Sequence, residues 1–157
     1  MKIDQIAYVC NTETDEEKLK KMLSLEKADW IQDRVSAKTK VWRENSSLIA
    51  PSVGFNVAAL QFNYDLGIEL EILRYLEGPN WHETNKEGLF FSHVGVHLAP
   101  GESFPEMAGA KLVQETRTTE HTAEYLTTGA GKGRTYHYKI FQISPGNFIK
   151  FIKRIDQ

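Results

Sequence analysis

Cysteine is nearly absent from this sequence, because Cys10 is the only one in 157 residues. A single thiol excludes an internal disulfide framework and any cysteine-rich zinc site. An excess of one charge sign is also missing, since 19 Lys and Arg stand against 21 Asp and Glu, for a formal net charge of −2. This balance provides no basic surface for nucleic acid, so we expect no nucleic-acid partner.

Long hydrophobic runs are missing too. Stretches such as 88–96 are far shorter than the ~20 residues that a helix needs to span a bilayer. Asp4 lies where a signal peptide would have its apolar core. We therefore expect a cytoplasmic protein with no membrane partner. The length favours a single globular domain over residues 1–157, or two small modules that share a core.

The first half of the chain, residues 1–76, predicts a strand, a helix and three further strands. Lys2–Cys10 is rich in good strand formers. Thr14 and Glu17 have the spacing of a capping box, and the apolar pattern after them predicts a helix that runs to about Leu25. The remaining strands are expected over residues 30–42, 56–64 and 68–75.

The same order returns in the second half, residues 88–157, after a polar linker over 77–88. A strand is expected over 89–98 and a short helix over 103–110, closed near Gly109. Extended segments follow from Lys111 onward and over 135–143 and 148–155. The chain is therefore interpreted as an α+β fold of two βαβββ modules.

Four segments carry this repeat: Asp4–Val9, Gly67–Leu73, Ser92–Val96 and Pro145–Ile152. In this order they resemble the vicinal oxygen chelate superfamily, which contains the glyoxalases, bleomycin-resistance proteins and extradiol dioxygenases. The last segment is similar to the Asp-Pro-Asp-Gly-Asn close of that family. The resemblance implies a glyoxalase-like fold, in which the two modules form a cupped, barrel-like mixed sheet around a ligand.

By motif, the metal-ligand positions of the family fall on Gln5, Glu71, His93 and Lys150. Glyoxalase-type lyases can use Gln, Glu, His and Glu in that order, so three of the four positions match. The resemblance thus implies a divalent metal, Zn or Ni, held by Gln5, Glu71 and His93. Lys150 departs from it, because a protonated ammonium has no lone pair for a metal and is repelled by one.

Three roles stay open for Lys150. Its ammonium can form an ion pair with Glu71 in place of the metal, or it can bind a ligand carboxylate or phosphate. Alternatively, Lys150 is a catalytic lysine whose pKa is lowered by burial. Glu71, His93 and Lys150 are the candidate catalytic residues.

Two further pairs of polar side chains alternate along single strands. Glu69 and Glu71 share one side of their strand, as do His93 and His97. Taken alone, the two carboxylates fit a solvated face, whereas the resemblance directs this side into the cup. Gln5, Glu69 and His97 are the candidate ligand-binding residues, with His97 a general base or hydrogen-bond donor.

Other motifs favour ordinary structure. Tyr136 and Tyr138 share one side of a strand, which is typical of cross-strand packing. The glycine-rich residues 129–134 lack the spacing of a phosphate-binding loop and predict a hairpin turn. Lys132 and Arg134 in this turn are candidates for contact with an anionic ligand at the rim of the cup.

The favoured function is a metal-free small-molecule binding protein of the bleomycin-resistance type, because such a site needs only a shaped cavity and a few polar groups. One alternative is a metal-dependent glyoxalase-, epimerase- or isomerase-like enzyme acting on a small oxygenated or thioester substrate. Another is a metal-free enzyme that uses Lys150 with His93 or His97. The linker over 77–88 suits a site closed within one chain or modules exchanged between two, and we expect a homodimer.

Overall fold

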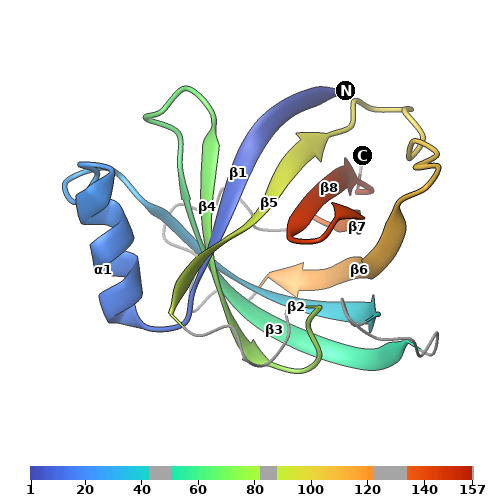
Figure 1. Ribbon diagram of the computed structural model, residues 1–157, viewed down its shortest axis with the longest axis horizontal. Coiled ribbons are helices and arrows are strands. Elements are labelled where there is room, and N and C mark those ends of the chain that lie inside the picture. The colour runs from blue at the N-terminus through green and yellow to red at the C-terminus, as the bar shows by residue number, and fades with distance from the viewer. Residues whose placement is uncertain (43–50, 82–87, 122–133, 157) are drawn as a thin grey trace.

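Eight strands close into a mixed barrel in the computed structural model, which describes residues 1–42, 51–81, 88–121 and 134–156 (Figure 1). The elements in chain order are β1 (Lys2–Cys10), α1 (Glu13–Met22), β2 (Ile31–Val41), β3 (Ser52–Asn63), β4 (Glu69–Glu77), β5 (Leu89–His97), β6 (Lys111–His121), β7 (Tyr136–Ser144) and β8 (Asn147–Arg154). Around the barrel their order is β1-β4-β3-β2-β6-β7-β8-β5. The prediction of a barrel-like mixed sheet is confirmed.

The two halves of the chain form the barrel in the same way. Within each half, the first and last strands pair in parallel, β1 with β4 and β5 with β8. The other pairs within each half are antiparallel. The halves join along β1–β5 and along β2–β6, both antiparallel. This arrangement places β4, β1, β5 and β8 side by side in the wall.

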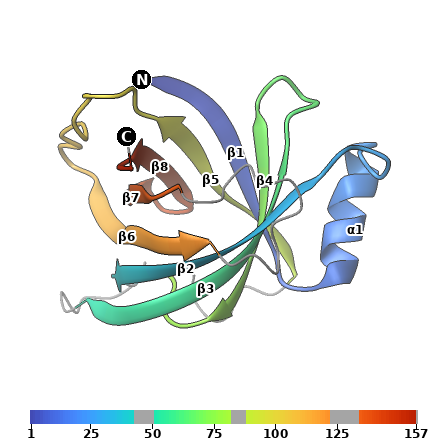
Figure 2. The same cartoon turned by 180° about the vertical axis from the view of Figure 1, so that it is seen from behind.

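Helix α1 covers β1 and β4 on the outside of the barrel, and Figure 2 shows it from behind. Leu19 packs there in a buried cluster with Cys10 and Ile72. The predicted capping box is displaced by two residues, because Thr12 is the N-cap and exchanges hydrogen bonds with Asp15 instead. Within the described part of the chain, no helix is long and apolar enough to cross a membrane.

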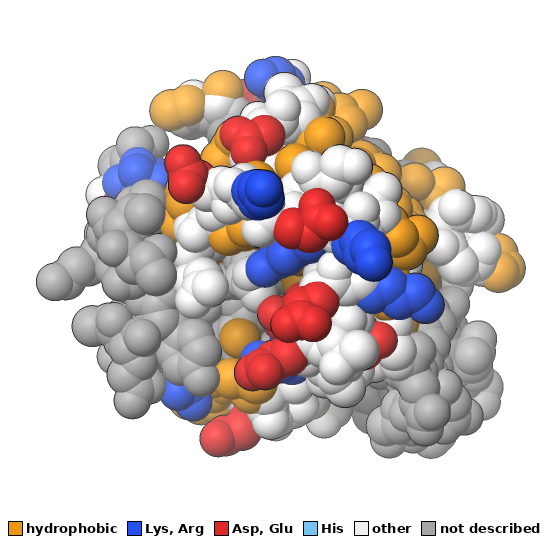
Figure 3. Space-filling view, turned by 90° about the vertical axis from the view of Figure 1, so that its left-hand side faces the viewer, with side chains coloured by type: hydrophobic (Ala, Val, Ile, Leu, Met, Phe, Trp, Pro, Cys, Tyr) orange, Lys and Arg blue, Asp and Glu red, His pale blue; other side chains and the backbone are white. Residues whose placement is uncertain are grey.

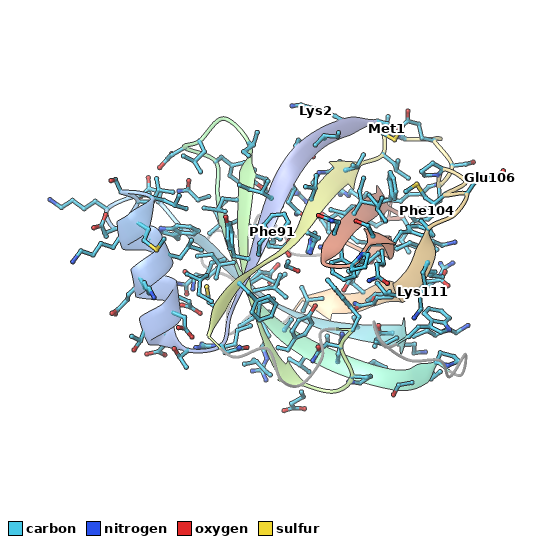
Figure 4. All side chains as sticks on the ribbon, viewed as in Figure 1. Met1, Lys2, Phe91, Phe104, Glu106 and Lys111 are labelled. Atoms are coloured by element: carbon cyan, nitrogen blue, oxygen red, sulfur yellow. The ribbon has the colours of Figure 1, made fainter. Side chains whose placement is uncertain are left out.

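The predicted second helix, over 103–110, is wrong. The structure has an irregular segment there, and its side chains Phe104 and Met107 pack on the outside of β5 and β8 against Val96 and Phe151. Figure 4 shows Phe104 on this segment between β5 and β6. Pro105 explains the difference, because the residue before a proline is disfavoured in the helical region and a segment this short cannot offset that cost.

One end of the barrel is closed by apolar side chains. The cluster there consists of Val41, Trp81, Val113, Ile140 and Phe148. Trp81 is fully buried, and its ring centroid lies 4.0 Å from that of Phe148. The segment after β4, interpreted as a polar linker, therefore contributes the largest fully buried side chain of the described residues.

The outer face beside α1 is polar. Acidic and basic side chains are interspersed over it (Figure 3). Between α1 and the sheet lies a hollow in which Gln61 accepts a hydrogen bond from Lys20 and donates one to Glu16. Ala59 lines the same hollow. Hydrogen-bonded polar side chains therefore lie beside the apolar contacts of α1.

Candidate functional site

The barrel encloses a cavity of about 150 Å³. Apolar side chains from several strands form much of its wall, among them Leu60 and Phe62 of β3 and Ile152 of β8. All six predicted site residues line it as well: Gln5, Glu69, Glu71, His93, His97 and Lys150. The structure therefore brings together every candidate catalytic and ligand-binding residue.

Glu71 is at the centre of the four positions that the family motif selected. Its carboxylate accepts a hydrogen bond from Gln5 Nε2 at 3.0 Å and one from Lys150 Nζ at 3.5 Å. His93 Nε2 lies 4.0 Å from the other carboxylate oxygen. These residues come from β4, β1, β8 and β5, which are neighbours in the wall. Glu71 and His93 are both buried, so these contacts form in a dry environment.

Glu69 lies one step closer to the open end of the barrel, on the same side of β4. It accepts a hydrogen bond of 2.7 Å from Gln5 Nε2. The hydroxyl of Tyr64 donates to it over 3.5 Å, and His97 Nε2 lies 3.9 Å away. The other ring nitrogen of His97 contacts Asp4 at 2.6 Å. Gln5 thus joins Glu69 to Glu71, and His97 lies between Glu69 and Asp4.

Gly95 makes room for Gln5. It faces Gln5 directly in the β1–β5 pair. A Cβ atom at this glycine would lie 2.6 Å from Gln5 Cβ, far inside van der Waals contact. The absence of a side chain at position 95 therefore lets Gln5 lie across the strand and reach both carboxylates.

Burial makes Glu69 an unusual acid. Desolvation and the nearby charge of Glu71 raise its pKa above the ordinary value, although Gln5, His97 and Lys150 act in the opposite direction. A carboxylate with a raised pKa in the folded state costs stability once the pH exceeds its unfolded pKa. The cost is complete when the pH also exceeds the raised value, so Glu69 opposes folding at neutral pH.

Glu69→Gln is therefore expected to stabilise the protein at neutral pH. The amide still accepts the Gln5 hydrogen bond, so Tm should rise, by about 2–4 °C for each kcal/mol gained in a chain of this size. Thermal unfolding followed by circular dichroism at several pH values measures the effect, which should shrink as the pH falls towards 4.

Glu115→Gln is the matched control. This carboxylate is partly desolvated, but its hydrogen bond with His137 and the charge of Lys139 lower its pKa. The control should lose stability at neutral pH, since a depressed carboxyl pKa stabilises the folded state there. Equal effects of the two substitutions would show that folding does not raise the pKa of Glu69.

The donor set does not fit a divalent cation as the side chains lie. Gln5 directs its amide NH₂, not its oxygen, to Glu71, and the Lys150 ammonium contacts the same carboxylate. Among the described residues, no three His, Cys, Asp or Glu side chains are placed to share a metal ion. The Lys150–Glu71 ion pair is the first of the three roles left open for Lys150.

Sequence reasoning missed several residues of the wall. Tyr136 and Tyr138, interpreted as cross-strand packing, line the cavity, and the ring of Tyr138 lies 4.7 Å from Lys150 Nζ. Gln114 donates a hydrogen bond of 3.3 Å to the Tyr138 hydroxyl. Arg134 lines the open end, whereas Lys132 and the rest of the predicted glycine-rich turn lie outside the described residues. Alternation along β7 was the signal available for the two tyrosines.

No protein-family model matches this chain, and no curated protein matches it either.

Proposed function

We propose that this protein binds a small molecule inside its barrel, without a metal, in the manner of the bleomycin-resistance branch of the vicinal oxygen chelate proteins. The observation that carries the proposal is the cavity itself, whose wall combines apolar side chains with polar ones that include all six predicted site residues. A ligand site requires this combination of apolar area and a few placed polar groups.

The glyoxalase-like form of the fold belongs to the same proposal. It is supported by the parallel pairing of the first and last strands in each half, β1–β4 and β5–β8. It is also supported by the position of Gln5, Glu71, His93 and Lys150 on these four strands, where they meet around one carboxylate.

A matched pair of substitutions tests binding in the cavity. Ala58 lines the cavity, whereas Ala59 lines the hollow under α1, because adjacent strand residues face opposite sides. The neutral probe 2-phenylethanol is expected to bind the wild-type protein with a Kd of about 1 mM or below, as its size allows. Ala58→Phe fills the cavity and should weaken binding by about tenfold or more, and Ala59→Phe should leave it unchanged.

Isothermal titration measures this binding, and thermal unfolding verifies that both variants are folded. Lack of probe binding by the wild type, or equal binding by the two variants, contradicts the proposal.

Elemental analysis of protein purified without a histidine tag tests the proposal that the site holds no metal. Near-stoichiometric zinc or nickel would contradict that proposal and favour the metal-dependent alternative.

A metal-free enzyme is the second candidate, and one observation favours it. Lys150 Nζ and His93 Nε2 both lie within 4.0 Å of the Glu71 carboxylate, so two side chains of types that can exchange protons face the same carboxylate in the cavity. Such a group can transfer protons to and from a bound ligand. Chemical conversion of a ligand that stops with Lys150→Met, while its binding persists, would distinguish this candidate from simple binding.

A further inference from the structure

We propose that the ligand of this cavity is a small organic cation, a primary ammonium on an apolar or aromatic body, with its ammonium at Glu69. The inference rests on the proposed function and names the class of molecule that the cavity selects. Glu69 and Glu71 are largely buried carboxylates of the cavity wall, and the one largely buried lysine or arginine among the described lining residues, Lys150, contacts Glu71. Glu69 therefore has no ammonium or guanidinium partner among the described residues.

Glu69 has weaker charge compensation than Glu71, which contacts Lys150 at 3.5 Å. The nearest basic side chain is His97, whose Nε2 lies 3.9 Å away, beyond hydrogen-bond distance, and whose ring already contacts Asp4 at 2.6 Å. The Tyr64 hydroxyl reaches Glu69 only at 3.5 Å. A carboxylate in this position has acceptor capacity left for a strong donor, and an ammonium supplies three N–H groups.

Aromatic rings accompany this carboxylate at the open end of the barrel. Tyr64 follows β3 and Tyr136 begins β7, and both line the cavity. An ammonium near the face of a tyrosine ring is attracted to its π electrons, and the attraction is stronger where water is excluded. Glu69 with these rings thus offers a cation both a charge partner and an aromatic wall.

The protein already holds one ammonium in this way. Lys150 Nζ lies 3.5 Å from Glu71 and 4.7 Å from the ring centre of Tyr138. The proposed site at Glu69 repeats this combination of carboxylate and tyrosine nearer the open end. The Lys150 contact shows that an ammonium is stable against such a wall.

A buried acceptor without a donor points to the same class of ligand. Gln114 is 1% exposed and lines the cavity, and its Oε1 has no hydrogen-bond partner among the described residues. A buried acceptor without a donor costs free energy, which a ligand N–H or O–H would recover. A donor-rich ligand therefore fits this wall better than an acceptor-rich one.

Arg134 is the one opposing charge at the open end of the described wall. Its side chain is exposed, so water and salt screen its repulsion of a cation, whereas Glu69 acts from a largely buried position. Arg134→Gln is accordingly expected to leave ammonium binding unchanged or to strengthen it. A ligand that uses Arg134 as its anchor would be weakened.

Three phenyl probes test the inference at neutral pH and physiological salt: 2-phenylethylamine and 2-phenylethanol, which match in size, and the slightly larger 3-phenylpropanoate. Isothermal titration should give about tenfold tighter binding for the amine than for the alcohol, the effect of one charge-assisted hydrogen bond. The carboxylate should bind most weakly. Glu69→Gln should remove the advantage of the amine and leave the affinity for the alcohol unchanged, whereas Glu102→Gln, at an exposed carboxylate, should change neither.

The outcomes separate this inference from the function on which it rests. If the alcohol binds in the cavity and the amine has no advantage, or if the advantage survives Glu69→Gln, the cationic ligand class is overturned and cavity binding stands. Preference for the carboxylate likewise overturns it in favour of an anion at Lys150 or Arg134. If none of the probes binds, both the inference and the proposed function are contradicted.

Discussion

Trp81→Ala is expected to lower the free energy of unfolding by about 3–5 kcal/mol, the usual cost of removing a large aromatic side chain from a core. Trp81 is fully buried and packs on Phe148 at the closed end of the barrel. Its removal leaves a void among side chains from β2, β6, β7 and β8 that cannot collapse, because the sheet is closed on itself. Urea unfolding with extrapolation to zero denaturant measures the loss.

Trp30→Ala is the comparison for Trp81→Ala. Trp30 is only half-buried, at the edge of α1, where its indole donates to the carbonyl of Leu25. Its removal should cost clearly less than that of Trp81, because less apolar area returns to water. If Trp81→Ala costs under about 1 kcal/mol, the residue does not close the barrel as described.

Gly95→Ala is expected to be the most damaging single-methyl change in the site. The new Cβ would lie 2.6 Å from Gln5 Cβ, so the β1–β5 pair must separate or Gln5 must leave its position. Overpacking of this kind costs about 1–3 kcal/mol, and Glu69 and Glu71 lose their shared donor in addition. Thermal unfolding should show a Tm lower by about 5 °C or more.

Gly54→Ala is its matched control, because a Cβ there would meet Pro79 at an ordinary 3.6 Å. The control should unfold near the wild-type temperature. A Gly95→Ala protein with the wild-type Tm and intact ligand binding would contradict the close packing of Gln5 against β5.

The sequence alone was sufficient to predict the strands and the residues that face the cavity from β1, β4, β5 and β8. Alternation along a strand assigns Glu69 and Glu71 to one side, and the family resemblance selects the side. The same resemblance predicted that Gln5, His93 and Lys150 belong to the site. It did not predict the wall residues Gln114 and Tyr138, because contacts between strands that are distant in the sequence depend on the register of the sheet.

Register explains the missed residues. A bulge separates Leu112 from Gln114 in the β6–β7 pair. The local sequence does not indicate which side chains point into the barrel after this bulge. The burial of Trp81 was not predicted, because a single tryptophan in a polar segment shows no hydrophobic periodicity. The segment over 103–110 was predicted as a helix from its composition, although Pro105 favours the irregular path that the structure shows.

The interior of the barrel is expected to hold a small ligand beside Glu69. The most direct test is an NMR titration of methyl-labelled protein with 2-phenylethylamine. The methyl signals of Leu60, Leu73 and Ile152, which line the cavity, should shift. Those of Leu19 in α1 and of Ile72, which packs against it, should keep their positions. Shifts confined to the methyl groups beneath α1, or no shifts at millimolar probe, would contradict the account.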